Sequence, residues 1–435
     1  MHPLRNLYRI GNGPSSSHTI APQRAALAFR ARHPGSASFR VTLYGSLAAT
    51  GKGHLTDVVV TAALAGETPR VSPAEHPMAS PPGGGAEPSK RVELVWKPKE
   101  ELPPHPNGMK LEALDAVGRV ISEALEFSVG GGALLSDDAA ADTGNTAPAS
   151  AAVYPAGTMA EILAFCEESG ESFWEYVQRC EGKEIWPFLE GIWEAMRAEV
   201  DRGLETEGVL PGRLGLRRKA YSFFRKARLL GRDDFRSEAF VAAYAYAVAE
   251  ENASGGLVVT APTCGSSGVL PAVLHHLNGE LKCRREEILR ALATAGLFGN
   301  LVKSNGSISG AAVGCQGEIG TACAMAAAAA TQLFGGSPPQ IEYAAEMGLE
   351  HHLGLTCDPV AGLVQIPCIE RNAHAATRAL SSCRFALLSD GLHRISFDDV
   401  VSVMVDTGKA LPALFRETSS GGLAKVYEQR LGGDP

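Results

Sequence analysis

The feature that most constrains the fold is a helical periodicity that begins near Thr158 and continues through the rest of the chain. Apolar residues recur at spacings of three and four in segments 159–168, 173–180 and 185–200, which is the pattern of amphipathic helices. Segment 321–334 is rich in alanine, so a helix there can pack closely against its neighbours. The sequence therefore predicts an all-α domain over residues 158–435.

The first 140 residues have a mixed pattern instead. A helix is expected at 22–31, and strands are expected at 39–44, 92–96, 109–114 and 117–127. Asn107 and Gly108 are a pair typical of hairpin turns, and we expect them to join the second of these strands to the third. The fold class is therefore α+β, with an N-terminal α/β domain.

Two stretches of small and polar residues separate or interrupt these regions. Residues 72–90 are rich in Pro, Gly and Ala and are expected to be a surface excursion. Residues 137–152 lack periodicity, and we place the linker between the domains at 141–157. The predicted domains are therefore 1–140 and 158–435, which fits a chain too long for one ordinary core.

Composition narrows the class of protein. The balance of 40 basic and 48 acidic residues gives a net charge of −8, and no basic run suggests nucleic-acid binding. No apolar stretch is long enough to span a bilayer, and the first residues lack the apolar core of a signal peptide. We therefore expect a cytoplasmic protein, in which nine cysteines are thiols or metal ligands rather than disulfides.

Three of the cysteines, Cys315, Cys357 and Cys368, lie in turn-like settings beside Gly or Pro. Thiolates are soft ligands that favour an iron–sulfur cluster over magnesium or manganese. Three of them without a fourth would leave a coordination position open, as in catalytic metal sites. Three buried thiols without a metal are the alternative, although the polar loops make that less expected. Of the others, five read as packing residues, and Cys264 lies in a polar loop.

Several polar loops are candidates for anion or substrate binding. Residues 15–19, Ser-Ser-Ser-His-Thr, precede the helix at 22–31, where helix amides favour an anion; a plain Ser-rich cap is the alternative. Loops at Thr263 and at 303–310 have a similar small and polar character. His54 follows a glycine and can act as a base, although a loop histidine is more often only solvated. Gly130–Gly132 can cradle a phosphate or simply form a bend.

Taken together, six motifs resemble the bacterial iron–sulfur L-serine dehydratases (L-serine ammonia-lyases) of the single-chain form. The motifs are Gly13-Pro14-Ser15-Ser16-Ser17-His18-Thr19, Gly51-Lys52-Gly53-His54 with Thr56-Asp57, Ala261-Pro262-Thr263, Ser307-Ile308-Ser309-Gly310, Gly314-Cys315-Gln316-Gly317-Glu318 and Cys357-Asp358-Pro359-Val360-Ala361-Gly362. The resemblance covers the chain from Gly11 to Ala424. The short motifs are not specific singly, but their combination is.

The resemblance implies a 4Fe–4S cluster held by Cys315, Cys357 and Cys368, and an N-terminal domain similar to an allosteric substrate-binding domain, in a homodimer. It implies that L-serine loses water to give pyruvate and ammonia, with His54 as the base that removes the α-proton. The implied substrate contacts are Ser15, Ser16, Ser17, His18, Thr19, Thr263 and Ser309. The resemblance also implies that Lys303, Asn305 and His351 lie next to these contacts and support the substrate site, with a weaker case for each.

The sequence departs from the family pattern in two places. Many relatives have Asn after Ala-Pro-Thr, where this chain has Cys264. Some relatives end in a cysteine that reaches the open iron, whereas this sequence ends in Asp434-Pro435. The first departure affects hydrogen bonding around the substrate, and the second predicts a more accessible and more oxygen-labile cluster.

Two other readings remain open. A pyridoxal-phosphate dehydratase would use Gly130–Gly132 as its phosphate loop and Lys303 as its Schiff-base lysine; it leaves the three cysteine loops without a role. A metal-stabilised amino-acid sensor would bind its ligand through the N-terminal domain, and the polar loops at Thr263 and Ser309 would then have no chemistry to serve.

Overall fold

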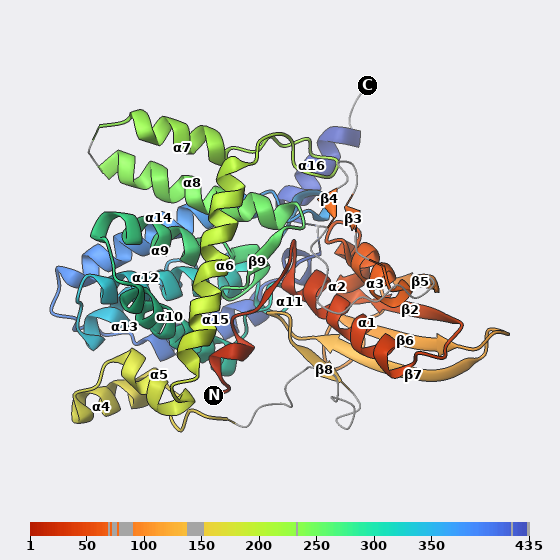
Figure 1. Cartoon of the computed structure of the whole chain (residues 1–435), viewed down its shortest axis with the longest axis horizontal. Coiled ribbons are helices and arrows are strands. Elements are labelled where there is room, and N and C mark those ends of the chain that lie inside the picture. The colour runs from red at the N-terminus through yellow and green to blue at the C-terminus, as the bar shows by residue number, and fades with distance from the viewer. Residues whose placement is uncertain are drawn as a thin grey trace.

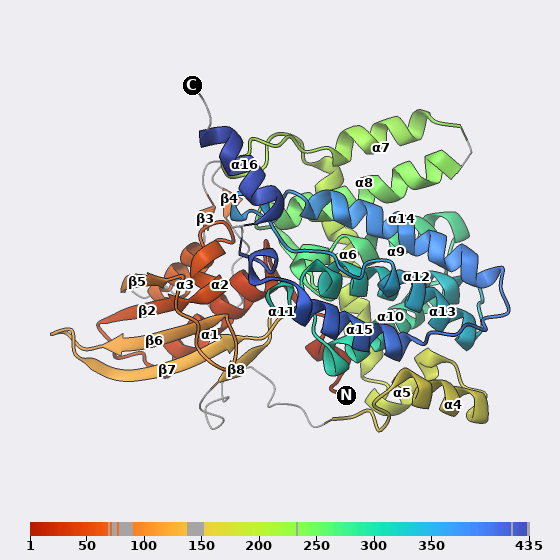
Figure 2. The same cartoon turned by 180° about the vertical axis from the view of Figure 1, so that it is seen from behind.

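The computed structural model describes residues 1–67, 70–71, 76–77, 90–136, 152–231, 234–418 and 421–432. Figures 1 and 2 show a β-sheet with its helices at one end of the molecule and a larger helical body at the other, which confirms the expected α+β class. Most of the excursion predicted at 72–90 lies outside the described residues. So do residues 141–151 of the predicted linker and the last residues, 433–435.

The N-terminal sheet has five strands in the order β5-β2-β6-β7-β8. These are β2 (Ser38–Tyr44), β5 (Arg91–Lys97), β6 (Gly108–Leu114), β7 (Val120–Ser128) and β8 (Leu134–Ser136). Alternate residues of β2 and β6 are buried against α1 (Ala21–Arg32) and α3 (Thr56–Ala65), and Phe29, Val41 and Val60 are among the residues of this core. A short helix, α2 (Gly45–Thr50), follows β2 directly.

The hairpin predicted at Asn107 and Gly108 is wrong. β5 and β6 are not neighbours, because β2 lies between them, parallel to β5 and antiparallel to β6. Gly108 is the first residue of β6 rather than part of a turn. Pairing of β2 with β5 joins residues about 50 positions apart, such as Val41 and Leu94, and a local turn signal carries no information on such pairing.

The helical body follows the predicted periodicity. Its helices are α4 (Met159–Ser169), α5 (Phe173–Glu181), α6 (Ile185–Glu205), α7 (Ala220–Leu229), α8 (Asp234–Ala253), α9 (Val269–Leu281), α10 (Arg285–Asn305), α11 (Gly310–Val313), α12 (Thr321–Leu333), α13 (Pro338–Glu350), α14 (Cys368–Leu387), α15 (Phe397–Ala410) and α16 (Gly422–Gly432). None of the described helices combines the length and the hydropathy needed to cross a bilayer.

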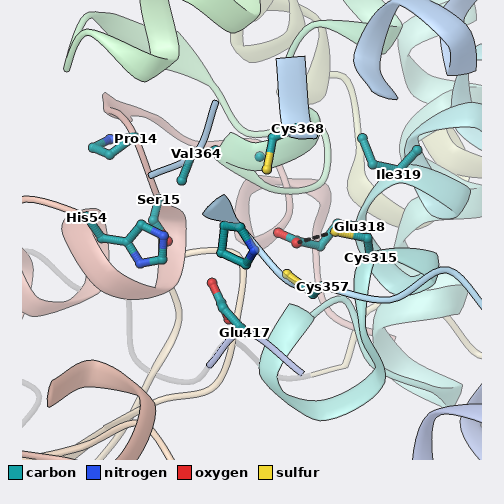
Figure 3. Close-up of a pocket in the computed structure, with 12 residues that line it drawn as sticks. Pro14, Ser15, His54, Cys315, Glu318, Ile319, Cys357, Val364, Cys368 and Glu417 are labelled. Atoms are coloured by element: carbon teal, nitrogen blue, oxygen red, sulfur yellow. Dashed lines mark hydrogen bonds between the residues drawn. The ribbon is translucent and has the colours of Figure 1, made fainter. Parts of the chain in front are cut away.

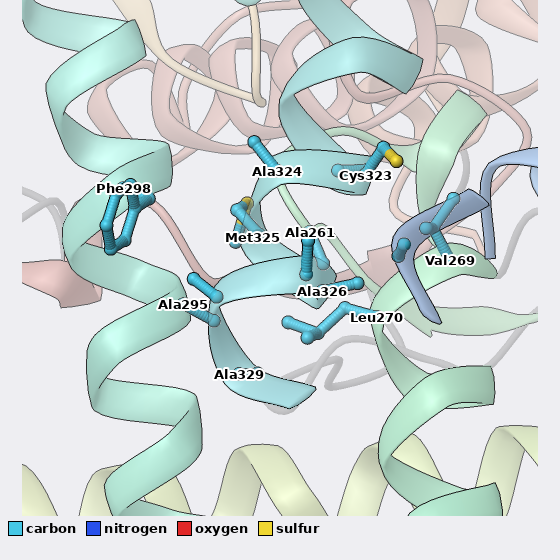
Figure 4. Packing of buried hydrophobic residues seen from close by; sticks show 14 of the residues in the cluster. Ala261, Val269, Leu270, Ala295, Phe298, Cys323, Ala324, Met325, Ala326 and Ala329 are labelled. Atoms are coloured by element: carbon cyan, nitrogen blue, oxygen red, sulfur yellow. The ribbon is translucent and has the colours of Figure 1, made fainter. Parts of the chain in front are cut away.

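The alanine-rich helix α12 is the centre of this body (Figure 4). All residues from Thr321 to Thr331 are fully buried. Figure 4 shows residues of α9 and α10 beside them, and α13 and α14 also pack against this helix. Small side chains let the neighbouring helices approach closely. A Cβ on Gly348 of α13 would lie 2.9 Å from the Cα of Ala324, for example. The rigidity of this packing supports the loops at the N-terminal ends of α12 and α14.

The first residues of the chain also belong to this body. Leu4, Leu7 and Tyr8 are buried in the helical core, and strand β1 (Ile10–Asn12) pairs antiparallel with β9 (Leu257–Val259). Because the strands are antiparallel, the loop that follows β1 starts beside Gly256, and the loop that follows β9 starts beside Arg9. Both loops carry predicted substrate contacts.

Candidate metal and substrate site

A cavity lies where the loops of the N-terminal region meet the helical body (Figure 3). Its lining consists of Pro14, Ser15, His54, Gly265, Cys315, Glu318, Ile319, Cys357, Pro359, Val364, Cys368 and Glu417. The three predicted metal-binding cysteines and the predicted base therefore lie around one space. The cysteines are on the side of the helical body, and His54 lies across from them.

Cys315 is held by the turn that precedes α12. Gly314 before it has a φ of +76°, a left-handed conformation that favours glycine. The side chain of Gln316 after it accepts a hydrogen bond from the amide of Gly354 and donates to the carbonyls of Val313 and Met404. These contacts fix the turn, so the sulfur has a defined direction into the cavity.

Cys357 and Cys368 are held by backbone and side-chain bonds of their own. The amide of Cys357 donates to the carbonyl of Phe415 at 2.7 Å. Cys368 is the first residue of α14, and Asn372, one turn later, donates to its carbonyl at 2.9 Å and to that of Gly265 at 2.8 Å. All three thiols are buried and none is in a disulfide.

The donor set fits a soft metal or a metal–sulfur cluster. Sulfur atoms of Cys315 and Cys357 and a carboxylate oxygen of Glu318 lie within 4.8 Å of one another. A hydrogen bond with Cys315 and burial raise the pKa of the Cys357 thiol well above its usual range. Burial, and then Cys315, likewise raise the pKa of Cys368. Crowded thiols of this kind give up their protons when a cation binds, because the cation replaces them as the counter-charge.

Glu318 faces the sulfurs from the turn that begins α12. It accepts a hydrogen bond from the hydroxyl of Thr263 at 2.7 Å, and its other oxygen lies 3.9 Å from the sulfur of Cys315. Burial raises the pKa of this carboxyl, and the Thr263 hydroxyl acts against that rise. A Cβ on Gly310 would lie 2.8 Å from Glu318 and 3.3 Å from the Cys357 sulfur, so only glycine fits there without a shift.

The motif at 15–19 forms a tight turn, Ser16–Ile20, that is capped by Ser15. The Ser15 hydroxyl accepts a hydrogen bond from the amide of His18. This bond caps the turn and not the following helix α1, which has no side-chain cap, so the alternative of a serine cap on that helix is wrong. The turn also binds the His54 segment, because the Thr19 hydroxyl donates to the carbonyl of His54 at 2.7 Å and Thr56 donates to that of His18 at 2.6 Å.

His54 is buried, and its Nδ1 has no hydrogen-bond partner in the described structure. Its ring packs edge-on against that of His18, with centroids 4.5 Å apart. Burial, and then the neighbouring His18, lower the pKa of His54 well below its usual value. The lowered pKa favours the neutral ring, and its Nδ1 makes no hydrogen bond within the described structure.

His18 is fully partnered. Its Nδ1 lies 2.9 Å from the Ser17 hydroxyl and 3.5 Å from the Glu417 carboxylate, and its Nε2 lies 3.1 Å from the Ser46 hydroxyl. Burial lowers its pKa to about 4. These contacts hold the His18 ring in place, and this ring in turn packs against the ring of His54.

A backbone contact keeps the His54 loop against the cysteine loops. A Cβ on Gly53 would lie 2.3 Å from the carbonyl oxygen of Gly362, in the loop between Cys357 and Cys368. Such a separation is shorter than any real contact, so the two backbones meet only because residue 53 has no side chain. The geometry of the cavity depends on this approach.

The other predicted site residues fall into two groups. Ser309 is buried beside Gly310, and its hydroxyl has no partner among the described residues. Lys303, Asn305 and His351 do not line the cavity. Lys303 donates to the carbonyl of Asn6 at 2.6 Å, Asn305 donates to that of Gly157 at 2.8 Å, and His351 lies half-exposed beside Glu350. Cys264 is buried but is not part of the lining.

The glycine triplet forms a bend whose carbonyls, rather than its amides, bind charged groups. Gly131 accepts a hydrogen bond from Arg9, and Gly132 accepts one from Arg24 at 2.6 Å. A phosphate cradle would need amides pointing inward. The pyridoxal-phosphate alternative therefore loses its phosphate loop, and its lysine is bound to a backbone carbonyl instead.

Sequence reasoning did not assign a role in the site to Glu318 or Glu417, and it placed Asn107 in a hairpin turn. Glu318 stands in a motif that carries the resemblance, so its position was a usable signal. Nothing in the sequence pointed to Glu417. It lies about 60 residues from Cys357 and reaches the cavity only because the backbone at Arg416 pairs with that at Cys357. Asn107 is fully buried, and both polar atoms of its side chain lack a partner among the described residues.

Two family models match the chain. The serine dehydratase alpha chain model matches residues 112–424, and the serine dehydratase beta chain model matches residues 4–80. The chain belongs to the serine dehydratase family. The alpha and beta chain models thus match successive parts of this one chain. The alpha match begins inside β6, so the domain boundary predicted at 141–157 stays a prediction.

Relatives of this serine dehydratase family member are similar over their whole length. The L-serine dehydratase of Streptomyces coelicolor is 44% identical over 96% of this chain and 97% of its own. L-serine dehydratase 1 of Escherichia coli is 40% identical over 98% of this chain and 99% of its own. That of Helicobacter pylori is 36% identical over the same shares, 98% and 99%.

Proposed function

We propose that this member of the serine dehydratase family is an L-serine ammonia-lyase that removes water from L-serine. The observation that carries the proposal is a single cavity. It is lined by three cysteines that form no disulfide and by a buried histidine whose Nδ1 has no hydrogen-bond partner among the described residues. Full-length relatives named L-serine dehydratase support the choice of substrate. Pyruvate and ammonia are the expected products.

Cys315, Cys357 and Cys368 would hold a 4Fe–4S cluster. Their softness as ligands, their burial and their place around one cavity fit such a group. A cluster with three cysteine ligands supplies a Lewis-acidic iron with one open position. Arg371 acts against the rise in the pKa of Cys368, so its positive charge would help to balance the charge of the thiolates.

His54 would take the α-proton of L-serine. It is neutral because burial lowers its pKa, and its unpaired Nδ1 can form a new bond to hydrogen. A substrate carboxylate near the ring would favour the imidazolium as the proton arrives, since opposite charges stabilise the charged form. Loss of the α-proton and of the β-hydroxyl gives aminoacrylate, which tautomerises and then hydrolyses to pyruvate and ammonia.

The polar groups around His54 would orient the substrate. Ser15 lines the cavity, while Ser16, Ser17, His18 and Thr19 set the turn that holds it. Thr263 would act through Glu318, to which it is bound, and Ser309, which is not part of the lining, has a buried hydroxyl without a partner among the described residues. Lys303, Asn305 and His351 have other partners or lie outside the lining, so no direct substrate contact is proposed for them.

The proposal also includes a homodimer located in the cytosol. Nine free cysteines support a reducing compartment, and the family resemblance supports the dimer. The N-terminal α/β region is proposed to be a regulatory domain, because its loops reach the cavity through Ser15 and His54.

The deciding experiment uses protein purified and reconstituted without oxygen. We expect a brown protein with broad visible absorbance, about four irons per chain and pyruvate release from L-serine. His54→Ala should keep the iron content and the absorbance and lose turnover, whereas Cys357→Ser should lose the cluster itself. A colourless protein that binds L-serine without turning it over would favour the sensor, and a yellow protein that loses its colour to hydroxylamine would favour pyridoxal phosphate.

A further inference from the structure

Three buried polar side chains meet at the side of the cavity where His54 lies. They are His18, His54 and Glu417; each offers one possible ligand atom, and these atoms lie within 4.8 Å of one another. Figure 3 shows His54 and the Glu417 carboxylate on this side of the cavity. The sulfur atoms of Cys315 and Cys357 belong to a separate group of possible ligands.

Two of these side chains carry a polar atom without a hydrogen-bond partner among the described residues. These atoms are Nδ1 of His54 and Oε2 of Glu417, and both residues line the cavity. His54 is 1% exposed and Glu417 is 6% exposed, so water covers little of either side chain. A buried polar atom without a partner lowers stability, and a cation bound by the imidazole and the carboxylate would remove that cost.

The hydrogen bonds of His18 leave a lone pair on its Nδ1. The Ser46 hydroxyl donates to the backbone carbonyl of Glu417 at 3.1 Å, so its oxygen accepts from Nε2 of His18, also at 3.1 Å. Nδ1 is therefore the unprotonated nitrogen of the neutral ring, and it lies 3.5 Å from Oε1 of Glu417. Histidines that bind metals commonly donate their other ring N–H to a fixed acceptor in this way.

We propose that His18, His54 and Glu417 form a second metal site, which binds a divalent transition-metal ion such as Zn²⁺ and inhibits turnover. The binding does not rest on the proposed activity. The inhibition does rest on it, because it requires His54 to be the base for L-serine.

The donor set and its spacing suit zinc. Two imidazoles with one carboxylate are ligands that zinc accepts, whereas calcium and magnesium prefer oxygen ligands. In a tetrahedral site with bonds of about 2.0–2.1 Å, ligand atoms lie about 3.4 Å apart, close to the 3.5 Å between His18 and Glu417. The Ser17 hydroxyl lies 2.9 Å from Nδ1 of His18 and has a second possible partner in the Ser15 hydroxyl at 3.2 Å. A cation can therefore take its place at Nδ1.

A cation in this position would prevent proton transfer at His54. Its bond to the imidazole would occupy the lone pair that the proposed base needs for the α-proton. Any proton on the Glu417 carboxyl would leave as the cation binds, because metals bind the charged form of a carboxylate. Zinc would thus hold the two groups on one side of the cavity without displacing a ligand of the cysteine group.

Equilibrium dialysis of the reconstituted holoprotein against Zn²⁺, with iron measured in the same samples, tests the binding. We expect about one zinc per chain and an unchanged iron content. Glu417→Gln keeps the shape of the side chain but removes the charged ligand, so it should raise the Kd of this zinc about 100-fold or more. Glu318→Gln is the matched control, because it changes a carboxylate that lies beside Cys315 in the same cavity; its zinc Kd should be unchanged.

X-ray absorption at the zinc edge needs no variant, so it tests the ligands even where a substitution disturbs folding. Zinc in the wild-type holoprotein should have nitrogen and oxygen neighbours at about 2.0–2.1 Å and no sulfur at about 2.3 Å. Sulfur neighbours in protein that has kept its iron would overturn the proposal. So would a zinc Kd that Glu417→Gln leaves unchanged, or one that Glu318→Gln raises instead.

Turnover separates this inference from the proposed function. If the holoprotein releases pyruvate from L-serine, saturating Zn²⁺ should remove most of that activity, and unchanged turnover would overturn the inhibition. A protein that binds zinc through Glu417 but does not act on L-serine would contradict the proposed function alone.

Discussion

Glu417 is joined to Cys357 by the backbone: its amide donates to the Cys357 carbonyl at 2.7 Å, while the Cys357 amide donates to the carbonyl of Phe415. This short pairing brings a residue from the C-terminal segment into the cavity, 3.5 Å from Nδ1 of His18. Glu417 adopts a φ of +59°, rare for a residue with a side chain. Burial, and then Glu318, raise the pKa of its carboxyl well above the usual range.

Glu417→Gln should therefore lower kcat by about 100-fold, because a carboxyl with a raised pKa can give a proton to the leaving hydroxyl and an amide cannot. The side-chain shape is preserved, so iron content and visible absorbance should not change. Glu370→Gln, an exposed carboxylate paired with Lys219, is the control and should remain active. Full activity of Glu417→Gln would remove the residue from the reaction.

Gly53→Ala should separate the two halves of the cavity. Its Cβ would meet the Gly362 carbonyl at 2.3 Å, and backbone cannot move aside as a flexible side chain does. His54 would shift with the loop, and a displacement of about 1 Å can cost about 100-fold in rate. Gly35→Ala is the control: its Cβ would have no atom within 4 Å, so this variant should keep the wild-type rate. Steady-state kinetics with L-serine would show the difference, and equal rates for the two variants would contradict it.

Local signals predicted the helices well but not the pairing of strands. Periodicity located the helical body from Thr158, and Gly and Pro around the three cysteines indicated loops or helix ends, as observed: Cys368, for example, is the first residue of α14. The partner of β5 could not be read locally, because β2 is about 50 residues away and the Asn107-Gly108 pair suggested a hairpin instead. The pairing of β1 with β9 joins residues about 250 positions apart and left no mark in the sequence.

In the candidate site, too, the residues in local motifs could be predicted and those placed by long-range contacts could not. Cys315, Cys357, Cys368, His54 and Ser15 were named from motifs, and the structure brings them to one cavity. Glu417 was missed because only its backbone bond to the Cys357 loop places it there. Lys303 and Asn305 were named with the loop that contains Ser309, yet both belong to the last turn of α10 and donate to the backbone carbonyls of Asn6 and Gly157. Neighbours in sequence can thus point to different parts of the molecule.

Thr263→Val should destabilise the iron-free protein by about 1–3 kcal/mol, because it removes the hydroxyl that donates to the buried Glu318 carboxylate. Thr263→Ser keeps the hydroxyl and should lose much less. Thermal unfolding of both variants gives the comparison, and iron content after reconstitution should fall only in the valine variant, since Glu318 faces the sulfur of Cys315. Equal melting temperatures for the two variants would show that the bond contributes little.

Lys303→Met should change how stability depends on pH. Burial, and then Arg9 and Arg24, lower the pKa of Lys303 from 10.5 to about 7. Between those values the unfolded chain binds the proton and the folded chain does not, so this lysine makes stability rise with pH. The advantage of the methionine variant in Tm should therefore be largest near pH 7 and shrink toward pH 10. Lys409→Met, at an exposed position, should follow the wild-type curve in parallel, and a parallel curve for Lys303→Met as well would show that the buried amine titrates normally.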